Sequence, residues 1–219
     1  MCGRFALQAS AVEMHDFLGE AMPELYTPRY NIAPTAPVLA KTDQAVTFFS
    51  WGLVPSWSKD VNIGSRMFNA RAETVAEKPS FRNAFRRRRC LVPASGFYEW
   101  QAQDGGKQPY FFHLAQRPLF CFAGIWEHWS DAMGNELQSC SILTREARGS
   151  MRAVHHRMPV VLDPGQYATW LDHQDEDTDR AQQCIAHSVE DFDYYAVSRR
   201  VNSARNEGPE LVERLEQGG

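Results

Sequence analysis

The feature that most constrains the fold is a series of short strand-like segments in the middle of the chain. They are rich in aromatic and β-branched residues, and they span residues 90–92, 96–100, 109–114, 119–126 and 137–144. Gly105 and Gly106 separate two of these segments, and the glycine-containing segment 131–135 separates another two. Short connections of this kind are typical of β-hairpin turns. The middle of the chain therefore predicts antiparallel hairpins.

Helical patterns lie on both sides of these hairpins. Apolar residues recur near helical spacing in the segment before Pro23, and Asp163 followed by Pro164 is typical of a helix start. The predicted helices span residues 11–22, 79–87, 163–171 and 178–187; further strands are predicted at 46–53 and 158–162, and a loop at 51–57. Hairpins flanked by helices predict an α+β fold with a mainly antiparallel β-sheet or partial barrel. Because the chain shows no internal repeat or low-complexity linker, we expect residues 1–219 to form a single domain.

The formal net charge of -4 argues against a nucleic-acid binder, but the charge is unevenly distributed. Residues 1–162 hold 18 Lys and Arg against 14 Asp and Glu, whereas residues 163–219 hold 5 against 13. The first part can carry a basic binding face, and the second can equally be a solvated acidic surface, so composition does not choose between them. No apolar run approaches the roughly 18 residues of a membrane span, and the start of the chain lacks a signal-peptide pattern. We expect no membrane partner.

The five cysteines show neither C-x-x-C spacing nor an even number, so we expect no zinc site and no disulfide framework. Cys121 and Cys140 lie in strand-like segments and are predicted to be buried. Free buried thiols are typical of a reducing cytoplasm. We expect no metal and no cofactor.

Cys2 differs from the other cysteines because it lies at the start of the chain. Removal of Met1 would leave an α-amine and a thiol on one residue, with ordinary pKa values of about 7.7–8.0 and about 8.5. An aldehyde can condense with that amine, and the thiolate can close the imine into a thiazolidine ring. Alternatively, the thiol can attack a carbonyl, as in amide hydrolysis.

Three other segments carry candidate chemistry. Asn69, Arg71 and Glu73 can bind a sugar and clamp a phosphate, or they can form a capped helix start with a salt bridge. Glu99 lies between aromatic residues, where desolvation would raise its pKa and suit it to acid–base catalysis, unless it faces solvent. His155 is followed by a second histidine, and adjacent histidines in an extended chain are a poor metal pair.

A run of arginines, Arg86 to Arg89, lies close to two phenylalanines. Such a run can attract a phosphate backbone, although charge runs are more often simply solvated. The alternatives for each of these segments remain open on residue chemistry alone.

Taken in order, segments spread along almost the whole chain resemble the SRAP family, the SOS response-associated peptidases or abasic-site processing proteins. They are CGRF at 2–5, YNIAP at 30–34, WGLVPSW at 51–57, NARAET at 69–74, GFYEW at 96–100, HHRMP at 155–159, the valine, serine and asparagine pattern of 197–202, and NEGPEL at 206–211. Each motif is modest, but their common order is specific. The resemblance implies an SRAP-like fold.

The resemblance also implies a covalent sensor of abasic sites in single-stranded DNA. Cys2 would form a thiazolidine crosslink with the ring-opened deoxyribose, and Asn69 would hold the sugar. Glu99 would transfer protons during condensation and self-reversal. His155 would assist ring opening and the strand-cleaving elimination of an abasic-site lyase.

The DNA contacts follow from the same resemblance. Arg4, Arg71 and Arg157 would bind phosphates, and Trp51 or Trp57 would stack on bases or separate them. The expected partner is single-stranded DNA containing abasic sites, bound by a monomer in the bacterial cytoplasm and at the nucleoid when DNA is damaged. Two alternatives remain: a thiol autopeptidase that uses Cys2 and His155, and a noncatalytic single-stranded DNA-binding protein.

Overall fold

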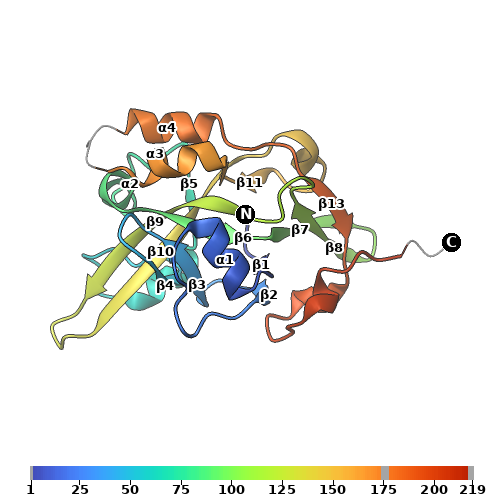
Figure 1. Cartoon of the computed structure of the whole chain (residues 1–219), viewed down its shortest axis with the longest axis horizontal. Helices are drawn as coiled ribbons and strands as arrows, with labels where there is room; N and C mark the ends of the chain where they lie inside the picture. Colours follow the sequence, from blue (N-terminus) through green and yellow to red (C-terminus); the bar gives the residue numbers. More distant parts are fainter. Residues whose placement is uncertain (1, 174–177, 217–219) are drawn as a thin grey trace.

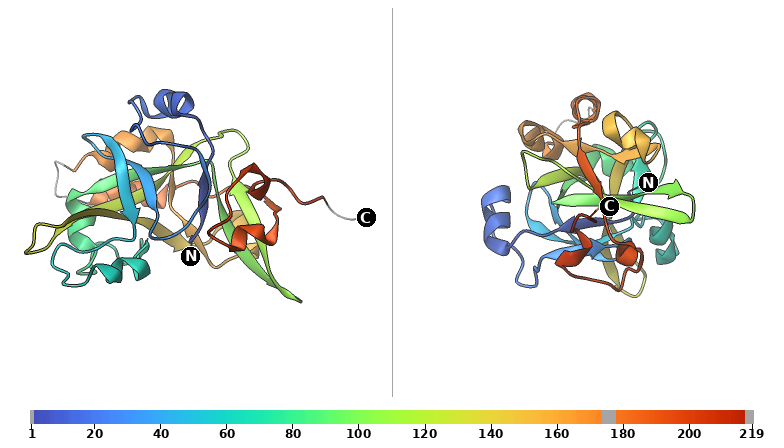
Figure 2. Two further views of the ribbon diagram at one scale, coloured as in Figure 1. Left: turned by 90° about the horizontal axis from the view of Figure 1, so that it is seen from below. Right: turned by 90° about the vertical axis from the view of Figure 1, so that its right-hand side faces the viewer.

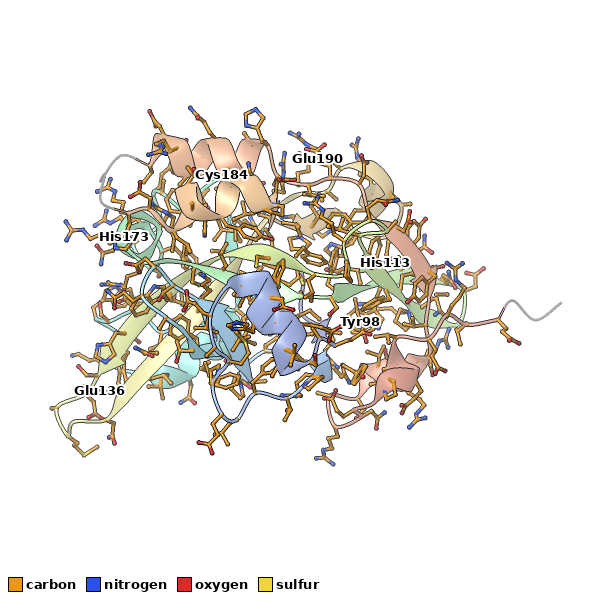
Figure 3. All side chains as sticks on the ribbon, in the orientation of Figure 1. Tyr98, His113, Glu136, His173, Cys184 and Glu190 are labelled. Carbon is orange, nitrogen blue, oxygen red and sulfur yellow. The ribbon has the colours of Figure 1, made fainter. Side chains whose placement is uncertain are left out.

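A long hairpin forms the centre of the fold in the computed structural model, which describes residues 2–173 and 178–216. Its strands, β9 (Phe120–Ser130) and β10 (Glu136–Glu146), pair antiparallel from Gly124 and Ile142 out to Ser130 and Glu136. The connecting turn is closed by Asp131, whose Oδ1 accepts the backbone N–H of Asn135 at 2.9 Å. The hairpin extends to the lower left of Figure 1, and Glu136 is labelled beside its tip in Figure 3.

The larger sheet curls into a partial barrel. Its order is β11-β10-β4-β3-β6-β9-β12. Because β10 also pairs with β9, the first and last of the five strands from β10 to β9 are joined to each other. The remaining strands are β3 (Pro37–Lys41), β4 (Val46–Trp51), β5 (Asn69–Arg71), β6 (Arg89–Ala94), β11 (Arg157–Pro159) and β12 (Val161–Leu162). Only the pairings of β10 with β4 and with β5 are parallel among the described residues.

The smaller sheet is antiparallel throughout its described pairings. Its order is β13-β8-β7-β1-β2, with bounds β1 (Phe5–Leu7), β2 (Arg29–Ile32), β7 (Gly96–Gln103), β8 (Gly106–His113) and β13 (Asp193–Ala196). Only Ser95 separates β6 from β7, so the chain passes directly from the larger sheet into the smaller one.

Helices cover the outside of the sheets. Helix α1 (Ala11–Leu18) lies on one side, and α2 (Arg82–Arg87), α3 (Tyr167–Leu171) and α4 (Asp179–Ala186) lie on another, as both views of Figure 2 show. Short 3₁₀ helices occur at Val61–Arg66, Gly149–Ala153, Pro164–Gln166, Arg199–Asn202 and Pro209–Leu211. No helix in the described part of the chain is both long enough and apolar enough to cross a lipid bilayer.

The main core includes aromatic rings that pack between the two sheets. Phe5 of β1 packs edge-to-face on Trp51 of β4 at 5.1 Å and on Phe122 of β9 at 5.5 Å between ring centroids. Phe97 of β7 also contacts Phe122. Edge-to-face pairs of buried aromatics add about 0.5–1.5 kcal/mol beyond their area burial. These contacts fix the first strand, and therefore the residues just before it, against the barrel.

The α+β class, the mainly antiparallel sheet and the partial barrel are confirmed, while several element bounds differ from the sequence prediction. The predicted helix 11–22 ends at Leu18 because Gly19 adopts a left-handed conformation with φ 72°. The predicted strand 158–162 is interrupted at Val160, which donates its N–H to Leu143 and accepts the N–H of Ala123. Residues 174–177, in the acidic part of the chain (163–219), lie outside the described residues.

Candidate active site

The N-terminal strand positions Cys2 against the smaller sheet. Strand β1 pairs with β7 through Phe5 and Phe97, and the N–H of Tyr98 donates to the carbonyl of Arg4 at 2.9 Å. Cys2 is completely buried. Because side chains alternate along a strand, Tyr98 and its neighbour Glu99 face opposite sides of β7. Tyr98, labelled in Figure 3, donates its hydroxyl to the carbonyl of Tyr30 in β2.

Asn69 holds the backbone of Cys2. Its amide Nδ2 donates to the carbonyl of Cys2 at 2.7 Å. Asn69 begins β5, which pairs in parallel with β10 in a register that sets Asn69 opposite Ile142. The other end of the side chain, Oδ1, is buried and accepts no hydrogen bond from a described residue. That oxygen is therefore available to accept a hydrogen bond from a ligand hydroxyl.

Glu99 is a buried carboxyl whose electrostatic field reaches Cys2. Its exposed fraction is 3%, and desolvation by this burial raises its pKa to about 7. Burial also raises the pKa of the Cys2 thiol well above its ordinary value, and the negative charge of Glu99 raises it further. A carboxyl that titrates near neutrality can both donate and accept a proton.

His155 shares a pocket with Glu99, although 55 residues separate them in sequence. The pocket has a volume of about 410 Å³ and is lined by Glu99, Trp100, Lys107, His155 and Asn202. Nδ1 of His155 lies 2.9 Å from the backbone N of Arg157 and 3.0 Å from its O, which fixes the ring orientation. Burial lowers the pKa of His155, so a neutral ring is favoured at neutral pH.

The three arginines predicted to bind phosphate lie in different environments. Arg4 donates to Oδ1 of Asn31 at 2.7 Å and to the carbonyl of Val201 at 2.8 Å. Arg157 makes a bidentate ion pair with Glu73, at 2.7 and 2.8 Å. Arg71 is exposed at the end of β5. Glu73 of the NARAET segment therefore forms its salt bridge with Arg157 of β11, outside the segment.

Of the two candidate tryptophans, the structure excludes Trp51 as a base-stacking surface. Its ring is completely buried, and its Nε1 donates to the carbonyl of Phe68 at 2.9 Å. It packs on Phe5 in the core, so the prediction for Trp51 is wrong because no ring face reaches the surface. Trp57 is 62% exposed in the loop that follows β4.

The arginine run that ends helix α2 is divided between the surface and the interior. Arg89 is buried and donates to the carbonyls of Phe85 and Trp170. Arg88 forms an ion pair with Glu127 at 2.7 Å. Half of the run therefore stabilises the packing of α2 and α3 against the barrel.

Three pocket residues were not predicted from the sequence: Trp100, Lys107 and Asn202. Nε1 of Trp100 donates to Oδ1 of Asn202 at 2.7 Å. Lys107 enters the pocket because the β7–β8 hairpin pairs it with Ala102. The glycines predicted the hairpin turn. The strand register that this turn sets was the signal that could have placed Lys107 beside β7. No group of three or more potential metal ligands occurs within residues 2–173 and 178–216.

Comparison with known proteins identifies the family. The model of the SOS response associated peptidase (SRAP) family matches residues 1–204. The chain belongs to the SRAP family. It is 39% identical to the abasic site processing protein YoqW of Bacillus subtilis (strain 168), over 97% of this chain and 99% of the relative. It is 32% identical to the abasic site processing protein HMCES of Gallus gallus, over 100% of this chain and 79% of the relative.

Solved structures confirm the SRAP-like fold. A protein from Bacteroides thetaiotaomicron superposes with a TM-score of 0.88 at 26% identity, covering 98% of this chain and 100% of that chain. A phage-related protein from Bordetella bronchiseptica superposes with a TM-score of 0.72 at 31% identity, covering 90% of this chain and 95% of the other. The overall fold is therefore shared with experimentally determined structures.

Proposed function

We propose that this SRAP protein processes abasic sites in single-stranded DNA by forming a covalent crosslink through Cys2. The observation that carries the proposal is the convergence of four residues from distant parts of the sequence. Asn69 binds the backbone of Cys2, the charge of Glu99 acts on the Cys2 thiol, and Glu99 and His155 line one pocket. The names of the relatives support the substrate, since YoqW and HMCES are abasic site processing proteins.

The crosslinking step needs both functional groups of Cys2, with Met1 removed. The α-amine adds to the C1′ aldehyde of the ring-opened deoxyribose, and loss of one water gives an imine. The thiol then adds across the C=N bond, so that sulfur bonds to carbon and the thiol proton passes to nitrogen. The resulting five-membered thiazolidine resists hydrolysis better than the imine because a C–S bond must first break.

Glu99 is suited to the proton transfers of this sequence. The buried thiol is protonated at neutral pH, so sulfur needs a base as it attacks the imine. Loss of water from the carbinolamine needs an acid. A carboxyl with a pKa of about 7 serves both steps, and the same transfers in reverse would release the DNA.

His155 and Asn69 are assigned to the sugar. The unoccupied Oδ1 of Asn69 accepts a hydrogen bond from a sugar hydroxyl, and the neutral ring of His155 acts as the base for ring opening. At the imine stage a base can also remove a C2′ proton. A double bond then forms, the C3′–O bond breaks, and its electron pair leaves with the phosphate, which is the lyase reaction.

DNA binding would rest on Arg71 and Trp57 at the surface, with Arg4 and Arg157 closer to the site. A phosphate that binds Arg157 must share its guanidinium with Glu73. Base stacking on an exposed aromatic ring is worth about 1–3 kcal/mol per base and does not depend on sequence. Single-stranded DNA suits this set better than a duplex, whose bases are already stacked.

The test uses protein with verified Met1 removal and a single-stranded oligonucleotide that contains one abasic site. We expect a heat-stable adduct on a denaturing gel with wild type, and none with Cys2→Ala, which keeps the amine and lacks the thiol. Cys184→Ala is the matched control, because Cys184 is also buried but lies in α4. A heat-stable adduct formed equally well by Cys2→Ala would refute the proposal. Equal binding of intact and abasic DNA without any covalent product would instead support the noncatalytic binder.

A further inference from the structure

We infer that Lys107 and Asn202 form a phosphate subsite in the pocket of Glu99 and His155, which holds the phosphodiester on the 3′ side of the abasic residue. The inference rests on the proposed function. It names residues that would decide which product, cleaved or crosslinked DNA, the site forms. Glu99 and His155 supply the acid–base groups of the 410 Å³ pocket, while Lys107 and Asn202 supply hydrogen-bond donors. A pocket with both kinds of group fits a reacting sugar together with its phosphate.

Lys107 supplies the positive charge of the subsite. It lies at the start of β8, is exposed, and forms no ion pair with another described residue. Its charge reaches both acid–base groups: burial dominates the pKa of Glu99 and of His155, and Lys107 lowers both pKa values. An ammonium group that forms no ion pair with a described carboxylate, and that lies beside two proton-transfer groups, is suited to binding an anion.

Asn202 supplies oriented neutral donors. Its Oδ1 accepts the indole N–H of Trp100 at 2.7 Å, which fixes the amide so that Nδ2 lies at its other end. Nδ2 makes no hydrogen bond to another described residue, so both of its N–H groups remain for a ligand. Asn202 ends the 3₁₀ helix Arg199–Asn202, whose Val201 is completely buried and anchors the segment.

The subsite acts on one of the two competing fates of the imine. Elimination breaks the C3′–O bond and converts a phosphodiester with one negative charge into a phosphomonoester that gains a second. Thiazolidine closure changes no charge on phosphate. Donors placed at the leaving phosphate therefore stabilise the transition state of strand cleavage more than that of ring closure. Lys107 and Asn202 would set the ratio of cleaved to crosslinked DNA.

Four variants test whether these residues set the ratio of cleaved to crosslinked DNA, on single-stranded DNA with one abasic site. Lys107→Met removes the charge, Lys107→Arg retains it, and Lys78→Met is the control at an exposed lysine outside the pocket. Asn202→Asp keeps an acceptor for Trp100 and replaces the N–H donors with an anionic oxygen. Initial rates of cleavage and of adduct formation are read from one denaturing gel.

With protein in saturating excess over DNA, we expect Lys107→Met and Asn202→Asp to lower the ratio of cleaved to crosslinked DNA about tenfold, equivalent to about 1.4 kcal/mol. Lys107→Arg should cleave at more than half the wild-type rate. An unchanged ratio in Lys107→Met, including one that results from an equal loss of both products, would overturn the inference.

A binding measurement separates this inference from the proposed function. The probe is an oligonucleotide with a tetrahydrofuran residue, which mimics the abasic sugar but has no aldehyde. Lys107→Met should weaken its binding about fivefold relative to Lys78→Met, and equal affinities would overturn the subsite. A wild-type protein that forms no adduct would refute the proposed function, and this affinity comparison would still decide the subsite.

Discussion

The burial of Glu99 bears both on its proposed catalytic role and on the stability of the fold. The hydrophobic surroundings raise its pKa from 4.5 to about 7, so that the carboxyl changes charge in the range where the reaction must run. The same burial makes the ionised form unfavourable in the folded protein. Residues of this kind lower the stability of the fold in exchange for reactivity.

The variant Glu99→Gln should therefore be more stable than wild type at high pH. The folded-state pKa lies above the unfolded value, so wild type loses stability as the pH rises from about 4.5 through about 7. E99Q lacks this titration, and its advantage should grow to about 3 kcal/mol by pH 8. Urea unfolding at pH 5 and pH 8 measures the difference. An advantage that is equal at both pH values would contradict the assigned pKa.

Glu99→Gln should also change the pH dependence of the reaction. In wild type the rate of adduct formation should show an inflection near pH 7, where Glu99 changes between acid and base. The variant should lose this inflection and form the adduct at least tenfold more slowly, as expected for loss of a general acid–base group. Single-turnover rates between pH 5 and pH 9 provide the measurement.

Asn69 is expected to act on Cys2 through geometry. Asn69→Ala removes the hydrogen bond to the Cys2 carbonyl and the acceptor predicted for the sugar. Adduct formation should fall about tenfold or more, because misplacing a reacting group by about 1 Å can cost 10²-fold. Asn69→Asp tests the donor separately, since it keeps an acceptor but loses the N–H. An adduct rate for Asn69→Asp equal to that of wild type would show that the donor is dispensable.

At the level of elements, the pairing of β1 with β7 decides where Cys2 lies. Gly96, at the start of β7, packs tightly against β8, because a Cβ at this position would lie 2.6 Å from the carbonyl oxygen of Phe112 and would overlap the ring of Phe111. Ala6 pairs directly with Gly96. A side chain there would push β7 and β8 apart next to the N-terminal strand.

Gly96→Ala should destabilise the protein by about 2 kcal/mol, as expected for overpacking of a tight contact. Adduct formation should fall further than the fraction of unfolded protein explains, since Cys2 lies just before β1, the strand that pairs with β7. Gly165→Ala is the matched control, because its Cβ would approach only Asp163, at 3.7 Å. Chemical denaturation and adduct rates on the two variants provide the test; similar stabilities would mean that β7 and β8 adjust to the methyl group.

The sequence predicted the elements that carry local signals and missed those defined by pairing. The β7–β8 and β9–β10 hairpins follow from their glycine turns and alternating residues. In contrast, β1, β5 and β13 are three or four residues long and are strands only because of their partners. Asn69 and Cys2 meet through β5 and β1, so the resemblance predicted their joint role while periodicity did not predict their contact.

The site residues that the sequence predicted wrongly or missed also depend on packing between distant parts of the chain. The burial of Trp51 could not be predicted from the sequence, because an aromatic residue before a loop can face either the core or solvent. Lys107 and Asn202 were missed because each reaches the pocket through long-range packing. The single-domain organisation and the monomeric state remain predictions.

For the whole molecule, the net charge is a poor guide to DNA binding. Every positively charged residue proposed to contact phosphate lies in residues 1–162, where basic residues exceed acidic ones, and the excess of acid lies in residues 163–219. Counterion release depends on local phosphate contacts, so the salt dependence should reflect the arginines of the site.

Arg71→Ala should therefore reduce the slope of log affinity against log salt by about 0.7, the value for one phosphate contact on a single strand. Glu213→Gln, an exposed carboxylate in the acidic part, is the control and should leave the slope unchanged. Fluorescence anisotropy with an intact single strand between 50 and 300 mM salt measures both. A slope that changes equally in the two variants would indicate a long-range charge effect in place of a direct contact.

All five cysteines are buried and unpaired, which gives the thiols a second use as reporters of motion. A maleimide can label a buried sulfur only when the surrounding structure opens, so the labelling rate of each cysteine measures the opening frequency of its own region. A cyanobenzothiazole reagent, which needs an amine and a thiol on neighbouring carbons, would select Cys2 alone once Met1 is removed. Comparing the two reagents would show how often the first strand leaves the sheet, and therefore how often the site admits an aldehyde.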